Sequence, residues 1–88
     1  MPTFDKSTRK YKKYSVITPA GRTLHFGDTR YKHYKDTTGL KHYSHLDHGD
    51  KNRRERYLVR AKGIKNKHGE LTYLDPESAN YYSVKYLW

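Results

Sequence analysis

Two β-prone runs separated by a three-residue turn limit the folds open to this 88-residue chain more than any other feature. Residues 14–18 (YSVIT) and 22–26 (RTLHF) flank Pro19-Ala20-Gly21. Proline presets φ at the first turn position, and Gly21 can adopt the left-handed conformation that closes a short hairpin. An isolated hairpin is only marginally stable in water. The apolar face of this hairpin therefore has to pack against other parts of the chain.

Aliphatic side chains for that packing are scarce. Val, Ile, Leu and Phe together make up 14 of the 88 residues, a share that is typical of disordered chains when net charge is high. Ten Tyr and one Trp change this expectation. Each can bury roughly 150–250 Å² while its polar end stays solvated. We therefore expect one small folded domain whose core is built as much from aromatic as from aliphatic side chains.

The chain is strongly basic. Nineteen Lys and Arg against nine Asp and Glu give a formal net charge of +10 and a pI near 9.8. Such a charge does not determine the fold, but it attracts polyanions. The partners it favours are nucleic acid, an anionic membrane surface or an acidic protein surface.

Cysteine is absent, which excludes disulfides, thiolate metal sites and cysteine nucleophiles. Residues 1–13 contain no apolar segment of the kind found in signal peptides. No run approaches the ~18 apolar residues that a membrane span needs. We therefore expect a protein that has no membrane span and is made inside a cell.

The best-defined helix runs from about Asp50 to Lys62. Asp47 or Asp50 can cap its first turn by accepting backbone N–H bonds, and Gly63 suits a left-handed stop. Arginine and lysine cover most of its surface. This segment is therefore predicted to be a central basic helix.

A second helix is expected near the end of the sequence. Asp75-Pro76 combines a capping residue with proline at the first helical position. Residues 80–88 fit a helix but also alternate as a strand would, and the preceding helix start favours the helix. The predicted fold class is α+β: an N-terminal β-hairpin packed on the central basic helix and a short aromatic-rich C-terminal helix.

The domain organisation follows from these elements. Residues 1–13 are rich in Lys and Arg and are expected to form a flexible basic arm. Residues 14–88 then form a single small domain that contains a long polar loop at 28–49. Loops of this length in a compact domain tend to be functional or ordered by a partner.

Basic residues interleaved with aromatic residues are the main candidates for binding. Cations neutralise phosphates, and exposed rings can stack on bases. The candidate polyanion-binding residues are Lys10, Lys12, Lys13, Arg30, Lys32, Lys35, Arg53, Arg54, Arg56 and Arg60. The candidate stacking or interface residues are Tyr31, Tyr34, Tyr43 and Trp88. With no recognisable base-reading motif, nucleic-acid contacts would be made mainly to the backbone.

The spacing His42-x-x-His45-x-x-His48 offers a possible metal site, because residues three apart are neighbours on a helix. Structural zinc sites usually draw ligands from two separate segments, and no cysteine supports this set. The alternative is that these histidines are partly protonated and face a polyanion, with anion affinity rising as pH falls through about 6.5. We favour this alternative and expect no bound metal and no cofactor.

Enzymatic activity is not expected. The sequence contains no paired metal-binding carboxylates at a recognisable spacing, no glycine-rich phosphate loop and no Ser-His-Asp order. A core this small would also hold a catalytic group poorly within the ~0.5 Å that catalysis requires. The sequence therefore favours a non-catalytic binding protein.

Four short motifs occur in a defined order: residues 14–22 (YSVITPAGR), 26–27 (FG), 48–57 (HGDKNRRERY) and 75–79 (DPESA). In this order they resemble a family of small, basic, functionally uncharacterised proteins encoded by nucleocytoplasmic large DNA viruses and some tailed phages. The resemblance covers roughly residues 12–88. Segment 36–47 is longer than the family pattern, so the resemblance says nothing about the histidines within it.

The resemblance implies a viral context but no activity. On that basis we expect a structural protein of a large DNA virus particle, made in the host cell interior and located in the virion. It would be a minor capsid or capsid-associated protein that binds neighbouring subunits or polyanions, with no small-molecule substrate. The alternative is a weakly sequence-specific nucleic-acid-binding or genome-packaging protein.

Overall fold

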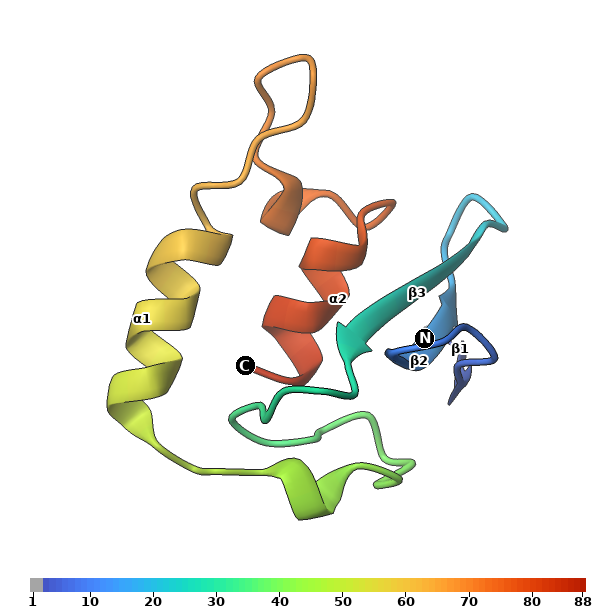
Figure 1. Cartoon of the computed structure of the whole chain (residues 1–88). Helices are drawn as coiled ribbons and strands as arrows, with labels where there is room; N and C mark the ends of the chain where they lie inside the picture. The colour runs from blue at the N-terminus through green and yellow to red at the C-terminus, as the bar shows by residue number, and fades with distance from the viewer. Residues whose placement is uncertain (1–2) are drawn as a thin grey trace.

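The predicted hairpin supplies two strands of a three-stranded antiparallel sheet in the computed structural model, which describes residues 3–88 (Figure 1). The strands are β1 (Thr3–Lys6), β2 (Lys12–Ile17) and β3 (Thr23–Asp28), in the order β1-β2-β3. The sheet is followed by two helices, α1 (Lys51–Ala61) and α2 (Ala79–Tyr86), and by two short 3-10 turns, η1 (Ser44–Leu46) and η2 (Thr72–Leu74). The predicted α+β fold class is confirmed.

The turn between β2 and β3 has the predicted geometry. Gly21 adopts a φ of 81°, and its N–H donates to the Thr18 carbonyl oxygen at 2.9 Å. The register pairs Tyr14 with Phe26. Because side chains alternate between the two faces of a strand, Tyr14, Val16 and Phe26 all point into the core, where each is at most 1% exposed.

The segment that was expected to be a flexible arm is different in the structure. Residues 3–6 form β1, which pairs with β2 so that Phe4 lies opposite Val16. The reason is the Phe4 ring, whose centroid is 5.9 Å from that of Phe26 and 4.6 Å from that of Tyr86. Lys12 and Lys13 belong to β2 itself. Residues 1–2 of the expected arm lie outside the described residues.

The core is an aromatic cluster between the sheet and α2. Tyr82 and Leu87 join the inward side chains of the sheet, and both are at most 2% exposed. α2 packs against β3 on one side and α1 on the other, so that it lies in the middle of the molecule (Figure 1). The expectation of a core with many aromatic side chains is therefore confirmed.

α1 has nearly the predicted bounds, but it ends differently. Asp50 caps the first turn, and its side chain accepts from the N–H groups of Asn52 and Arg53. The predicted left-handed stop at Gly63 is wrong, because the positive-φ glycines do not include it. The helix instead tightens at its end, where the Gly63 N–H donates to the Arg60 carbonyl oxygen at 3.1 Å.

α2 is a helix, as favoured, but it begins later than Asp75-Pro76 predicted. Asp75 and Ser78 close a turn, in which the Ser78 N–H donates to the Asp75 carbonyl oxygen at 2.9 Å. Ser78 then caps α2. The turn is held by Glu77, which accepts from the Thr18 hydroxyl at 2.6 Å and so ties this segment to the hairpin. The Asp75 side chain also accepts from the Glu77 N–H at 2.9 Å, so a local turn that is tied to the hairpin precedes the helix.

The segment between β3 and α1 runs across one end of the molecule and is bound to the end of α2 (Figure 1). Tyr34 N–H donates to the Leu87 carbonyl oxygen at 3.0 Å, and Thr37 N–H donates to that of Tyr86 at 2.9 Å. No helix within residues 3–88 has the length and apolar character needed to cross a membrane.

Candidate nucleic-acid interface

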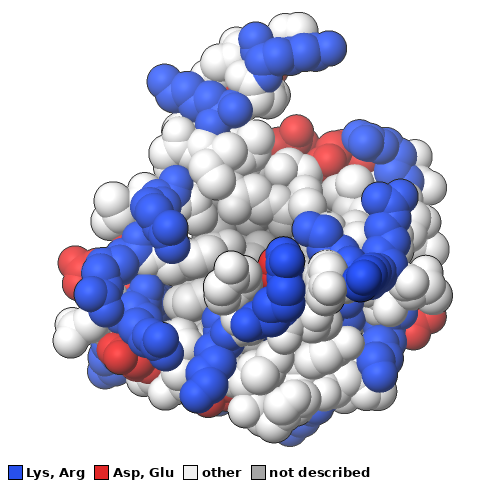
Figure 2. All heavy atoms as spheres, in the orientation of Figure 1, with Lys and Arg blue, Asp and Glu red and all other residues white. Residues whose placement is uncertain are grey.

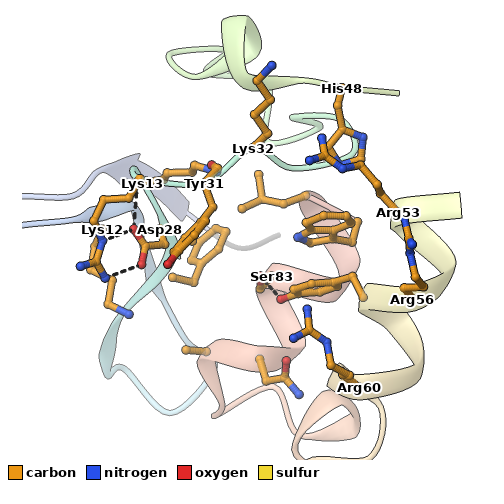
Figure 3. A pocket seen from close by; sticks show the side chains of 18 of the residues that line it. Lys12, Lys13, Asp28, Tyr31, Lys32, His48, Arg53, Arg56, Arg60 and Ser83 are labelled. Atoms are coloured by element: carbon orange, nitrogen blue, oxygen red, sulfur yellow. Dashed lines mark hydrogen bonds and ion pairs between the residues drawn. The ribbon is translucent and has the colours of Figure 1, made fainter. Parts of the chain in front are cut away.

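A groove of about 1410 Å³ lies between β3 and α1, with α2 beneath it (Figure 3). Side chains from the sheet and the following turn line one wall, and side chains from α1 line the other. The basic residues of its lining are Lys12, Lys13, Arg30, Lys32, Arg53, Arg56 and Arg60. Figure 2 shows this face, on which Lys and Arg side chains border a central hollow on both sides.

The α1 wall follows from helical periodicity. Arg53, Arg56 and Arg60 are spaced three and four residues apart, so they project from one face of the helix. All three are exposed, and no carboxylate among residues 3–88 lies within 4.0 Å of their guanidinium groups. Lys51, at the start of the same helix, and Lys62, just after its end, line a second, smaller hollow instead. The helix thus presents one basic face to the groove and another away from it.

The sheet wall differs in that one of its cations is compensated. Asp28 accepts two hydrogen bonds from the Arg30 guanidinium, at 3.0 Å from Nε and 2.8 Å from Nη2. These bonds lower the pKa of Asp28 to about 2. Lys12 and Lys32 are exposed, and neither forms an ion pair with a carboxylate in the described part of the chain. The groove therefore keeps an excess of uncompensated positive charge.

Aromatic rings form the floor and rim of the groove. Trp88 stacks on Tyr57 with a centroid distance of 4.0 Å and an interplanar angle of 8°. The Tyr57 hydroxyl is 3.0 Å from the Ser83 hydroxyl, which fixes this pair to α2. Tyr31 is 66% exposed at the rim. Of these rings, Tyr31 has the most open surface for a base to stack on.

The structure brings most of the predicted site residues together, but not all of them. Lys10, Lys35, Arg54, Tyr34 and Tyr43 do not line the groove. The Nε group of Arg54 donates to the main-chain oxygen of Trp88 at 2.6 Å, and its guanidinium lies over the Tyr34 ring. Tyr43 packs edge-on against Tyr14 in the core. Arg54 and Tyr34 thus contact each other and the end of the chain rather than the groove.

Lys13 lies at the bottom of the groove and is only 2% exposed. Its Nζ donates to the Tyr31 carbonyl oxygen at 2.9 Å and to His33 Nδ1 at 2.7 Å. Burial lowers the pKa of Lys13 to about 8, although the charges of three nearby aspartates oppose this effect. The ammonium group is thus anchored inside the protein instead of facing a ligand freely.

His33 continues this buried network. Lysine only donates, so Nδ1 of His33 is the acceptor and Nε2 carries the proton. Nε2 donates to Asp47 Oδ1 at 2.5 Å, and the same oxygen accepts from the Asp36 N–H at 2.8 Å. Burial lowers the pKa of His33, and the Lys13 charge lowers it further. Asp47 and Asp36 oppose these effects, and the net lowering of the pKa favours the neutral ring.

Asp36 and Tyr14 complete the network. The Tyr14 hydroxyl donates to Asp36, whose other carboxylate oxygen accepts from the Thr38 N–H and hydroxyl at 3.0 and 2.7 Å. Burial raises the pKa of Tyr14 to about 12, helped by its bond to Asp36. Burial alone would raise the pKa of Asp36, but the bonds from Thr38 and Tyr14 lower it below its usual value.

This buried network was not predicted from the sequence. Its members are 11 to 22 residues apart in each hydrogen-bonded pair, and no local pattern connects them. Lys13 is adjacent to another lysine, which made it look like a solvent-facing cation. The only signal in the sequence is that Lys13 lies next to the inward-facing Tyr14, and this position does not show whether the lysine side chain is buried.

The three candidate metal ligands are not assembled into a site. Within residues 3–88, no group of three His, Asp or Glu side chains could hold a metal ion. His48 packs against Trp88, with ring centroids 5.2 Å apart, whereas His45 packs against Tyr43. Segment 42–48 is an irregular chain with one 3-10 turn, so the helical spacing that would have gathered the three rings is absent.

Comparisons with known proteins give one match. No curated protein and no solved structure is significantly similar to this chain. A family model described as a family of unknown function (DUF5754) matches residues 3–61. The match starts at β1, earlier than the resemblance seen in the sequence, and ends with α1, so it includes both basic walls of the groove but not α2. Since the match covers more than half of the sequence, the chain belongs to this family of unknown function (DUF5754).

Proposed function

We propose that this chain is a non-catalytic nucleic-acid-binding protein that holds a phosphate backbone in the groove between β3 and α1. The observation that carries the proposal is the arrangement of exposed, uncompensated cations on both walls of one recess: Lys12, Lys32, Arg53, Arg56 and Arg60. Each cation that neutralises a phosphate releases a counterion, so affinity depends on salt.

Single strands are the favoured form of nucleic acid. The cations line a recess rather than a protruding helix that could enter a duplex groove. Tyr31 offers an exposed ring at the rim, and only unpaired bases can stack on such a ring. The protein would therefore contact the phosphate backbone and the faces of unpaired bases, with weak sequence specificity.

The two buried groups with lowered pKa values, Lys13 and His33, support binding rather than catalysis. Lys13 has the lowered pKa that catalytic lysines often have, but its ammonium is buried and hydrogen-bonded to Tyr31 and His33. His33 is likewise engaged on both ring nitrogens. These groups hold the groove wall in place and do not reach its opening.

A salt titration of the wild-type protein tests this proposal. Binding to a short single-stranded oligonucleotide and to a duplex of the same sequence is measured by fluorescence anisotropy from about 50 to 200 mM salt. We expect tighter binding to the single strand and a steep fall in affinity as salt rises. Absence of binding to either form at about 50 mM salt would rule the proposal out.

A structural role in a virus particle is the second candidate. The order of sequence motifs supports it, and so do apolar side chains that remain exposed: Val59 at 71%, Leu74 at 62% and Ile64 at 51%. Such side chains could contact neighbouring subunits of a capsid. We place this role second because the cations share a groove, whereas these three apolar residues come from three separate segments.

Purified particles separate the two candidates. When membrane and DNA are stripped from the particles, a minor capsid or capsid-associated protein stays with the shell. A genome-bound protein leaves with the DNA, and a protein absent from particles fits neither placement in the virion. Quantitative mass spectrometry of each fraction distinguishes these results.

A further inference from the structure

His48 is the residue of the groove lining whose hydrogen bonding is incomplete. Its Nδ1 accepts from the Asp50 N–H at 2.9 Å. A neutral imidazole has one proton, so Nε2 carries it and is a donor. Nε2 is buried, and no acceptor lies within hydrogen-bond distance of it among residues 3–88. Buried donors are nearly always paired, so this one requires an explanation.

The position of the ring is well defined. The His48 ring packs against Trp88, with centroids 5.2 Å apart, and lies edge-on to Tyr34 at 6.2 Å. Together with the bond from Asp50, these contacts leave little freedom to turn Nε2 toward another protein acceptor. The donor is therefore held in place at the end of the groove where α1 begins.

The charges around His48 are mainly positive on the groove side. Burial lowers the pKa of His48, and the charges of Arg53 and Lys32 lower it further, whereas Asp50 and Asp47 oppose them. Asp50 is already occupied with the N–H groups at the start of α1. Figure 3 shows the Arg53 side chain running from α1 toward the His48 ring. An N–H donor and a guanidinium thus lie together without an anionic acceptor.

We propose that His48 Nε2–H and the Arg53 guanidinium form a phosphate-binding subsite at this end of the groove. One phosphate oxygen accepts from the imidazole while the guanidinium neutralises the charge, and the exposed Arg53 side chain rotates to admit the group. The assignment of a backbone phosphate as the ligand rests on the proposed function. The subsite itself needs only a phosphate group and therefore also takes inorganic phosphate.

Inorganic phosphate tests the subsite directly on the wild-type protein. The ¹⁵N resonances of the histidine rings are followed by NMR while phosphate replaces chloride at constant ionic strength. We expect the Nε2 resonance of His48 to move saturably and the pKa of His48 to rise, with both effects lost in Arg53→Gln. If His48 does not respond while other groove residues do, or if no residue responds, the subsite is refuted.

Oligonucleotide binding separates this inference from the proposed function. His48→Phe keeps a ring beside Trp88 and Tyr34 but removes the Nε2 donor, together with the Nδ1 acceptor of the Asp50 N–H, and we expect about tenfold weaker binding of a short single strand. His45→Phe is the matched control, because His45 is exposed and does not line the groove. Thermal unfolding confirms that both variants fold.

The possible results are distinct. If wild type binds the oligonucleotide and His48→Phe binds equally well, the subsite is wrong and the groove still functions. If wild type binds no oligonucleotide but His48 responds to inorganic phosphate, the nucleic-acid proposal fails and the subsite remains as a small-anion site.

Discussion

The groove and the buried network beneath it contain the same kinds of residue but place their cations in opposite surroundings. In the network, the Lys13 ammonium is 2% exposed and lies within the influence of three aspartates. In the groove, Arg56 and Arg60 are exposed and have no carboxylate within 4.0 Å among residues 3–88. Burial and hydrogen bonding, and not the number of cations, therefore separate a structural cation from one that is available to a ligand.

The two regions are physically connected. Lys13 donates to the backbone carbonyl of Tyr31, so the network fixes the position of the groove rim. Asp47 bonds both His33 and the backbone of Asp36, and so ties the two ends of the 28–49 segment together. Damage to the network should consequently disturb stability first, whereas damage to the groove should disturb binding alone.

Asp36→Ala should give the largest effect. It removes the acceptor of the Tyr14 hydroxyl proton and of two Thr38 donors, so that the buried hydroxyl keeps only the bond it accepts from the His42 N–H. We expect a loss of about 3 kcal/mol of unfolding free energy, measured by urea denaturation. The control is Asp5→Ala, because Asp5 is exposed and should cost less than about 0.5 kcal/mol. Equal losses in both variants would contradict a structural role for the network.

Gly27→Ala should give the next largest effect, because Gly27 lies where the network meets the core. Its φ is +76°, and an added Cβ would come within 2.9 Å of Leu87 Cδ1 and 3.0 Å of Lys13 Cδ. We expect a loss of about 2 kcal/mol in urea denaturation. Gly39→Ala shares the positive φ but meets no atom within 4 Å, so it should cost only about 1 kcal/mol. A Gly27→Ala variant no less stable than Gly39→Ala would show that this contact is not tight.

The pH dependence of the unfolding free energy should show the contribution of His33. Its pKa is lowered in the folded state by burial and by Lys13, so the unfolded chain takes up a proton more readily. Unfolding free energy should therefore fall as pH drops through about 6.5, with a slope for this single proton of at most about 1.4 kcal/mol per pH unit. His33→Gln should reduce that slope, and an unchanged slope between pH 7 and 5 would contradict the assignment.

Tyr31→Ala should have the smallest effect and should act on the groove alone. Loss of an exposed stacking surface should weaken single-strand binding by about 1 kcal/mol, or about fivefold, with little change in stability. Tyr31→Phe keeps the ring and should bind like wild type. If duplex binding falls as much as single-strand binding, then Tyr31 does not stack on unpaired bases.

Local patterns in the sequence predicted the parts of the fold that depend on local physics. The Pro19-Ala20-Gly21 turn forms because only the glycine position needs a positive φ, and that requirement is visible in the sequence. α1 begins at Asp50, one of the two predicted caps, since its side chain accepts from the N–H groups of the first helical turn. Seven of the ten predicted cations line the groove, and for Arg53, Arg56 and Arg60 the reason is again local, because the helix period places them on one face.

The parts that could not be predicted depend on contacts between distant residues. Thr3–Lys6 has one apolar side chain, Phe4, and its burial requires Tyr86 at the other end of the chain. The turn before α2 is tied to the hairpin by Glu77, which is 59 residues from its partner Thr18. Lys13 and His33 have hydrophilic side chains that sequence patterns place at the surface. In the folded protein both are buried and hydrogen-bonded to each other. Sequence patterns do not encode such pairings.

A charge-matched pair of variants tests most directly whether the groove, and not the net charge, binds nucleic acid. One variant changes Arg53, Arg56 and Arg60 to Gln on the groove face, and the other changes Lys51, Lys62 and Lys67 to Gln outside it. Both lose three positive charges. The measurement is the slope of log affinity against log salt for a single strand. We predict that the groove variant's slope falls by about 2, at ~0.7 per lost phosphate contact, while the other stays near wild type. Equal slopes for the two variants would contradict a specific groove.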